Sequence, residues 1–159
     1  MDGTDKAILR ILQRDSATPV SDIAGEVGLS ATPCWRRIKK LEEDGVIRRR
    51  VALADMEALG LSLTAFISVK TARHNEAWLK TFADAIRRIP EILEVHRMSG
   101  EIDYLLKVVA PDMAAYDRVY KRLIASAEFS DVTTTFSMEV LKETTELPTD
   151  YAPVTRRAG

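Results

Sequence analysis

The spacing of apolar residues changes its period near residue 60, and this change limits the folds that the chain can adopt. Before that point apolar residues recur at the intervals of α-helices, whereas after it segments of strand period alternate with segments of helical period. A chain of 159 residues is long enough for two small domains, each with its own core. We therefore expect a helical domain over residues 1–50, a linker over 51–62, a second domain over 63–146 and a flexible tail over 147–159.

Three short helices are expected in the first domain. The first runs over Thr4–Arg14, and the second begins at Thr18, the N-cap, with Pro19 as its first helical residue. Gly28-Leu29-Ser30 then interrupts the pattern, because glycine permits a tight turn and serine is a favourable N-cap. The third helix is expected over about Ala31–Asp44.

The third helix combines one apolar stripe with a basic outer surface. Cys34, Ile38 and Leu41 lie at i, i+4 and i+7, so we expect them in the core, with Cys34 a core residue rather than a redox sensor. A strand predicted over Val46–Ala52 would form the wing of a winged helix. Such a unit suits the major groove of DNA, with cations on phosphates and N-terminal side chains at base edges. The residues expected to contact DNA are Ser30, Thr32, Pro33, Trp35, Arg36, Arg37, Lys39, Lys40, Arg48, Arg49 and Arg50.

The net charge of −1 does not suggest nucleic acid, but the distribution of charge does. Residues 1–50 contain ten bases and eight acids, and seven of these bases lie between Arg36 and Arg50. A basic helix alone is usually a solvated face. The helix-turn-helix spacing, the basic helix and the arginine-rich strand together favour double-stranded DNA as a partner. Trp35 has two equal alternatives, contact with the DNA backbone and packing against the first helix.

The rest of the chain follows the order strand-helix-strand-strand-helix-strand. This is the ferredoxin-like βαββαβ pattern, so the predicted fold class is α+β, a winged helix-turn-helix followed by an α/β sandwich. Two helices cover only one face of a four-stranded sheet, and the strands carry apolar residues on both faces. The open face therefore needs a partner, and a second copy of the chain in a homodimer is the economical choice. The expected strands are Leu61–Lys70, Ile92–Met98, Ile102–Ala110 and Val132–Leu141, and the expected helices lie over Trp78–Ile89 and Met113–Ile124.

Composition excludes several classes of protein. No apolar run approaches the roughly 20 residues of a membrane span, and the N-terminus lacks the features of a signal peptide. The single cysteine excludes an intramolecular disulfide and a cysteine metal site. The chain shows no Ser/His/Asp set, metal-spaced cluster or phosphate-binding glycine loop. We expect a cytoplasmic protein that is not an enzyme and has no cofactor, metal or membrane partner.

A series of short motifs, each weak alone, is specific in its order and spacing over Asp5 to about Pro148. They are Asp5-Lys6-Ala7-Ile8-Leu9, Val27-Gly28-Leu29-Ser30, Thr32-Pro33-Cys34, Arg37, Leu41-Glu42, Gly45-Val46-Ile47, Leu59-Gly60, Ser99-Gly100-Glu101-Ile102-Asp103-Tyr104 and Lys142-Glu143-Thr144-Thr145-Glu146-Leu147-Pro148. In these motifs the chain resembles the Lrp/AsnC family of leucine- and asparagine-responsive regulators. The resemblance implies a DNA-binding domain, a linker strand and an effector domain that assembles as dimers, often four dimers in an octameric ring.

The same resemblance implies an amino-acid effector, held in clefts between dimers. The family's glycine-acid-x-Asp loop maps onto Gly100, Glu101 and Asp103, and Glu101 stands where aspartate is usual, which leaves the identity of the effector open. A zwitterion needs an acceptor for its ammonium and donors for its carboxylate, and Gly100 lets the backbone approach closely. Without the resemblance, the same residues describe a β-turn capped by Asp103. The expected effector-binding residues are Met98, Ser99, Gly100, Glu101, Asp103, Thr133, Thr134 and Thr135. Which of the three threonines faces the ligand stays open, because a one-residue shift in register turns every side chain of a strand to the opposite face of the sheet.

Two other functions are open at this point. Decarboxylases of haem precursors, of the sirohaem type, resemble this family and would use His74 or His96 as an acid or a ligand. Such an enzyme has no need of the basic helix. An architectural DNA binder without a ligand is the second alternative, and its DNA affinity would ignore every amino acid.

Overall fold

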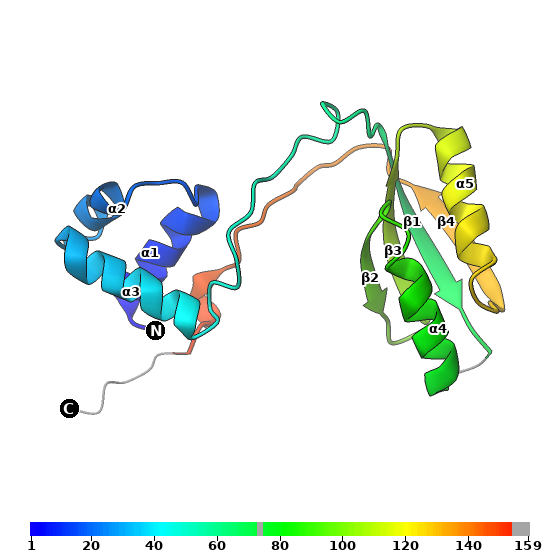
Figure 1. Cartoon of the computed structure of the whole chain (residues 1–159), viewed down its shortest axis with the longest axis horizontal. Helices are drawn as coiled ribbons and strands as arrows, with labels where there is room; N and C mark the ends of the chain where they lie inside the picture. The colour runs from blue at the N-terminus through cyan, green and yellow to red at the C-terminus, as the bar shows by residue number, and fades with distance from the viewer. Residues whose placement is uncertain (73–74, 154–159) are drawn as a thin grey trace. The chain divides into compact units, whose positions relative to one another are not determined.

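The computed structural model describes residues 1–72 and 75–153, and the chain forms two compact units (Figure 1). The first unit joins Met1–Leu53 to the C-terminal segment that begins at Lys142, and the second unit is Ala54–Leu141. The polypeptide therefore passes between the units twice. Part of the segment expected as a flexible tail, residues 147–153, contacts the first unit along its first helix and near Met1.

The first unit contains three helices, α1 (Gly3–Arg14), α2 (Val20–Glu26) and α3 (Ala31–Glu43), and the short 3-10 helix η1 (Thr149–Tyr151). A single apolar core joins α1, α2 and α3. The predicted core position of Cys34 is confirmed, since its side chain is fully buried. The start of α2 differs by one residue from the prediction, because Pro19 is the N-cap and the Thr18 hydroxyl donates to the Asp15 carbonyl instead. The core consists of Ile8, Leu12, Ile23, Ala24, Cys34, Ile38 and Leu41.

The strand predicted over Val46–Ala52 does not form. After α3 the chain turns at Gly45, which has a positive φ of 70°, and the Ile47 amide donates to the Leu41 carbonyl at 2.9 Å. A strand needs a hydrogen-bonded neighbour. Among the described residues no segment lies paired beside this one, so its β-branched and arginine residues do not make a wing strand here.

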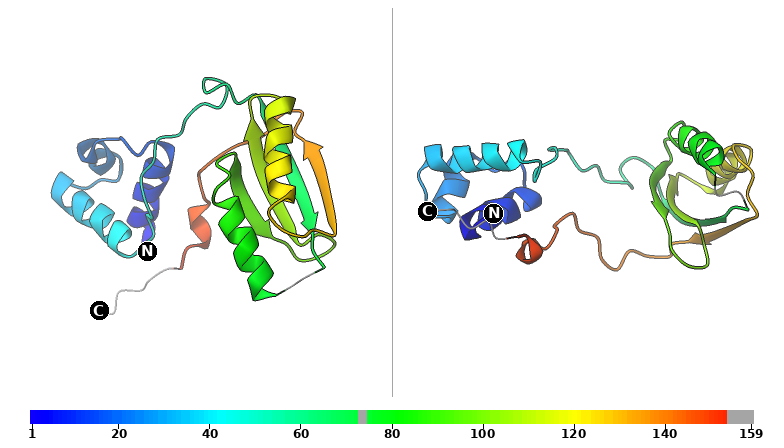
Figure 2. Two further views of the ribbon diagram at one scale, coloured as in Figure 1. Left: turned by 45° about the vertical axis from the view of Figure 1, so that its right-hand side comes forward. Right: turned by 90° about the horizontal axis from the view of Figure 1, so that it is seen from below.

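The second unit confirms the predicted βαββαβ order. Its antiparallel sheet has the strand order β2-β3-β1-β4, and α4 and α5 cover one face (Figure 2). The elements are β1 (Leu63–Lys70), α4 (Glu76–Ile86), β2 (Ile92–Arg97), β3 (Tyr104–Ala110), α5 (Met113–Ile124) and β4 (Asp131–Phe136).

Strand register separates the two faces of the sheet. On the helix-covered face Ile67 pairs with Leu106, and both are fully buried beneath α4 and α5. On the opposite face Phe66 pairs with Lys107 and Thr135. No described helix of this unit covers that face of the sheet (Figure 2). The predicted extension of β4 to Leu141 is wrong, because β4 ends at Phe136. The Ser137 amide still donates to the Thr64 carbonyl at 2.9 Å, but β1 begins at Leu63, so the residues after Met138 lie beyond its end and have no strand to pair with.

Candidate nucleic-acid interface and ligand loop

Helix α3 presents its polar and basic side to solvent. Its buried stripe fixes the helix against α1 and α2, which turns Thr32, Trp35 and Arg36 outward. Trp35 is 50% exposed, which favours the outward alternative over packing against α1. The N-cap Ser30 makes no capping hydrogen bond from its side chain, so α3 begins with amides that a phosphate oxygen can accept from.

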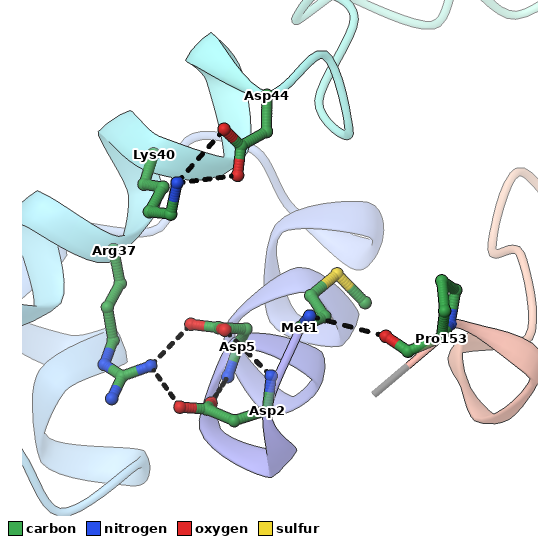
Figure 3. A network of polar contacts seen from close by, with 7 residues as sticks. All are labelled: Met1, Asp2, Asp5, Arg37, Lys40, Asp44 and Pro153. Carbon is green, nitrogen blue, oxygen red and sulfur yellow. Dashed lines mark hydrogen bonds and ion pairs between the residues drawn. The ribbon is translucent and has the colours of Figure 1, made fainter. Parts of the chain in front are cut away.

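Several of the residues predicted to contact DNA form only weak ion pairs within the chain, or none among the described residues. Lys39 pairs with Glu42 at 2.8 Å, and Lys40 pairs with Asp44 at 3.0 Å (Figure 3). Arg50 also contacts Glu42, at 3.1 Å. Exposed pairs of this kind contribute little, about 0–1 kcal/mol, so a phosphate can replace the acid. Among the described residues, Arg36, Arg48 and Arg49 form no ion pair, and all three are exposed.

Arg37 is placed differently from its basic neighbours. Its guanidinium lies between two carboxylates at the N-terminus of α1, with Nη1 2.7 Å from Asp2 Oδ2 and 2.6 Å from Asp5 Oδ1 (Figure 3). Both acids also form the capping box of α1, through the Asp2 and Asp5 amides. Arg37 therefore joins α3 to α1, since two internal carboxylates hold the guanidinium that the sequence predicted to contact DNA.

Electrostatics follow this geometry. The Asp5 amide, and after it the Arg37 guanidinium, lower the pKa of Asp2 below its ordinary value of 3.8. The two carboxylates in turn raise the pKa of Arg37, first through the hydrogen bond to Asp2. Residues three and four apart share a helix face, so Arg37 lies with Cys34 and Leu41 at the border of the buried stripe.

The predicted ligand loop joins β2 to β3. It is closed by the Met98 amide, which donates to the Asp103 carbonyl at 2.8 Å, and Gly100 has a φ of 123° that favours glycine. The Asp103 carboxylate accepts from the Thr71 amide at 2.7 Å, so it braces the loop against the end of β1. Met98, Ser99, Gly100 and Glu101 are exposed.

The register of β4 settles which threonines share a face. The Thr134 hydroxyl is hydrogen-bonded to the Tyr116 hydroxyl on α5, so Thr134 lies on the helix-covered side. Thr133 and Thr135 lie on the open side, where they pair with Ser68 and Phe66 of β1. The structure does not bring them together with the β2–β3 loop within one chain, because β1 stands between β3 and β4.

His96 is the histidine that the structure describes, and it lies in an exposed group of polar side chains on the sheet. His96 is exposed on β2 and lies 3.0 Å from Glu94 Oε2, while the other oxygen of that carboxylate, Oε1, lies 3.6 Å from Lys107 Nζ. The hydrogen bond from His96 is the largest cause that lowers the pKa of Glu94. His74 lies outside the described residues. Across residues 1–72 and 75–153, no group of three or more His, Cys, Asp or Glu side chains is placed to hold a metal ion.

Among the helices of these same ranges, none has the length and apolar character to cross a membrane.

Two protein families match the chain, one for each part of the fold. The family described as winged helix-turn-helix DNA-binding matches residues 1–48, and the Lrp/AsnC ligand binding domain matches residues 64–147. The first match covers α1, α2 and α3, and the second covers the sheet from the second residue of β1 onward, together with α4 and α5.

Similar proteins cover nearly the whole chain. The DNA-binding transcriptional activator DecR of Escherichia coli is 45% identical over 93% of this chain and 98% of its own length. An AsnC family transcriptional regulator from Agrobacterium tumefaciens has a crystal structure with a TM-score of 0.93, 57% identity and coverage of 96% of this chain and 100% of that chain. A transcriptional regulator from Neisseria meningitidis, solved in complex with L-methionine, has a TM-score of 0.90, 35% identity and coverage of 94% and 97%.

Proposed function

This chain belongs to the Lrp/AsnC family of transcriptional regulators, and from that premise we propose which of its surfaces binds DNA and which binds an effector. It is a DNA-binding regulator with an amino-acid-binding domain, and not an enzyme, in line with the regulators to which it is similar. The decarboxylase alternative is not favoured by any of these relatives. The family works on DNA, which supports a place in the cytoplasm.

The DNA-binding surface in this proposal is the outer side of α3 with the arginines that follow it. The observation that carries it is the division of α3 into a buried stripe and an exposed basic side. Trp35, Arg36 and Lys39 lie where side chains of a helix in the major groove meet bases and phosphates. Arg48, Arg49 and Arg50 contact the flanking backbone. Arg37 is left out of this set because Asp2 and Asp5 hold it.

The test is the affinity of the full chain for a duplex that the wild-type protein selects from a random-sequence library. We expect Arg36→Ala to weaken binding by about tenfold, since one good contact to a base or phosphate is worth roughly 1–3 kcal/mol. The matched control is Lys80→Ala, which removes an exposed cation from α4 in the other unit. Equal affinities for wild type, Arg36→Ala and Lys80→Ala would contradict the assignment.

The effector in this proposal is a free α-amino acid bound at the β2–β3 loop. The loop offers exposed amides around Gly100, which can donate to a carboxylate, on a frame that Asp103 holds to β1. Thr133 and Thr135 of a neighbouring subunit complete the site, since they lie on the open face of the sheet. The relative solved with L-methionine supports an amino acid as the class of ligand.

Homodimers form through the open sheet face in this proposal, with four dimers as the larger assembly. Phe66, 37% exposed, lies on that face among the partly buried residues of β1 and β3, and a second copy removes it from water.

Thermal unfolding with each of the twenty amino acids tests the proposed effector. A ligand that binds the folded state raises the midpoint by mass action, and no shift with any amino acid at millimolar concentration would contradict the effector assignment.

A further inference from the structure

The C-terminal segment after the sheet binds along one side of α1. The contacts run antiparallel to the helix: Glu146 meets Arg14, Leu147 meets Gln13, Asp150 meets Arg10 and the Pro153 carbonyl accepts from the N-terminal ammonium. Lys6 joins this series, since its Nζ donates to the Asp150 carbonyl at 3.3 Å. The α1 residues that contact the segment are spaced so that they form one stripe of the helix: Lys6, Arg10, Gln13 and Arg14. Hence α1 uses its apolar stripe for the core and a second, polar stripe for the C-terminal segment.

Each step of this contact is specific. Arg10 donates from Nε to the Thr149 hydroxyl at 2.9 Å and from Nη2 to Asp150 Oδ1 at 2.6 Å. The Gln13 amide accepts from the Leu147 amide at 2.8 Å and donates to the Leu147 carbonyl at 3.2 Å, so it pairs with the backbone as a strand would. Thr149 is only 5% exposed. We call residues Glu146–Pro153, bound in this way, the clasp.

The clasp is held by polar contacts far more than by apolar burial. Its large side chains Leu147 and Tyr151 stay exposed, and so do the ion-pair partners of Arg10 and Arg14. Exposed ion pairs are individually weak, and salt screens them. The chain therefore holds its own C-terminal segment by contacts that ordinary changes in ionic strength can loosen.

The position of the clasp in the chain gives it a consequence. The polypeptide enters the second unit after Leu53 and leaves it again after Leu141. With the clasp closed, the first unit is attached to the second at both crossings. With the clasp open, it is attached through one linker alone, and the cations of α1 are released from their acids.

We propose that the clasp is a releasable second tether on the DNA-binding unit, and that its closure favours binding to DNA by limiting the freedom of that unit. Restricting the motion of linked binding units raises their effective concentration at a second half-site. This part of the inference rests on the proposed function, whereas the existence of a releasable clasp does not.

Hydrogen exchange of the full chain tests the clasp without DNA or effector. We expect the amide of Leu147 to exchange about tenfold faster in Arg10→Asp than in wild type, since that substitution sets like charges against Asp150. The charge-swapped double variant Arg10→Asp/Asp150→Arg should restore slow exchange. Lys121→Asp, a charge reversal on α5, is the matched control and should leave the rate unchanged.

Milder variants keep the test valid if charge reversal at Arg10 disturbs α1. Glu146→Gln/Asp150→Asn keeps size and removes both acids, so it should speed exchange at Leu147, as should 500 mM salt in the wild type. Wild-type rates in Arg10→Asp, in Glu146→Gln/Asp150→Asn and at 500 mM salt would overturn the clasp.

DNA affinity of Glu146→Gln/Asp150→Asn tests the tether. Charge alone predicts tighter binding, because two acids are lost, while the tether predicts binding several-fold weaker to a duplex with two half-sites. Equal or tighter binding would overturn the tether. Failure of the wild type itself to bind any duplex would instead contradict the proposed function and leave the exchange result standing.

Discussion

Helices α1 and α3 both carry a basic side, but the two sides are used differently. On α1 the bases Lys6, Arg10 and Arg14 are all engaged by the C-terminal segment. On α3 and just beyond it, Arg36, Arg48 and Arg49 are exposed and form no ion pair among the described residues. The comparison separates cations that the chain's own C-terminal segment engages from cations that remain available, and we propose DNA as the partner of the second group only.

The largest expected contrast is in DNA affinity. The double variant Arg48→Ala/Arg49→Ala should lose about one to two orders of magnitude in affinity at low salt, and the slope of log K against log salt should fall by about two. Arg10→Ala/Arg14→Ala should lose only several-fold, through release of the clasp, with the slope nearly unchanged. Equal slopes for the two double variants in fluorescence anisotropy titrations would remove the contrast between the helices.

Arg37 sharpens the comparison from inside α3. Arg37→Ala leaves Asp2 and Asp5 without their shared partner, so we expect the free energy of unfolding of the chain to fall by about 1 kcal/mol. The stability of Arg37→Lys should lie between those of the wild type and Arg37→Ala. Urea unfolding followed by circular dichroism measures this change. Arg36→Ala is the matched control and should be within about 0.5 kcal/mol of wild type. If Arg36→Ala costs as much stability as Arg37→Ala, the distinct role of Arg37 is wrong.

Acid should weaken the same joint between α1 and α3. The pKa of Asp2 is lowered in the folded chain, so its contribution to stability is complete above its ordinary value of 3.8 and is lost as pH falls through the lower folded value. Asp2→Asn lacks this term. We therefore expect the difference in stability between wild type and Asp2→Asn to shrink as pH falls from about 5 toward 2. Thermal unfolding of both proteins at a series of pH values measures this difference. A difference that stays constant over this range would show that the Asp2 charge has no part in the joint.

The smallest effect is expected at the exposed pair of Lys40 and Asp44. Both side chains are at least half exposed, and their separation is 3.0 Å. Asp44→Asn should change stability by less than about 0.5 kcal/mol and should slightly strengthen DNA binding, because it frees Lys40 for phosphate. Weaker binding by Asp44→Asn would indicate that the Lys40 pair positions α3 and does not compete with DNA.

The βαββαβ order could be predicted from sequence because each element has its own hydrophobic period, which is local information. The buried position of Cys34 followed from the same periodicity. Arg37 was also open to prediction, since it lies three residues after Cys34 and four before Leu41, on the buried side of α3. Its place in a basic run suggested DNA more strongly than its place on the helix suggested the core.

The clasp and the missing wing strand lay beyond local reasoning. The partners in the clasp are more than 130 residues apart in the chain and polar, so no apolar pattern links them. One signal exists, namely the four-residue spacing of Lys6, Arg10 and Arg14 matched by the acids Glu146 and Asp150. The prediction of the wing strand was wrong although its local pattern is clear. A strand-like sequence forms a strand only where a second segment pairs with it.

The most direct test of the DNA-binding surface uses the fact that Cys34 is the single cysteine and is fully buried. A cysteine introduced by Lys39→Cys on α3 can then be labelled selectively by a thiol reagent, with Lys80→Cys on α4 as the matched control. We predict that the selected duplex slows labelling of the Lys39→Cys variant at least several-fold and leaves the Lys80→Cys variant unchanged. Labelling of the Lys39→Cys variant at the same rate with and without bound duplex would contradict the account.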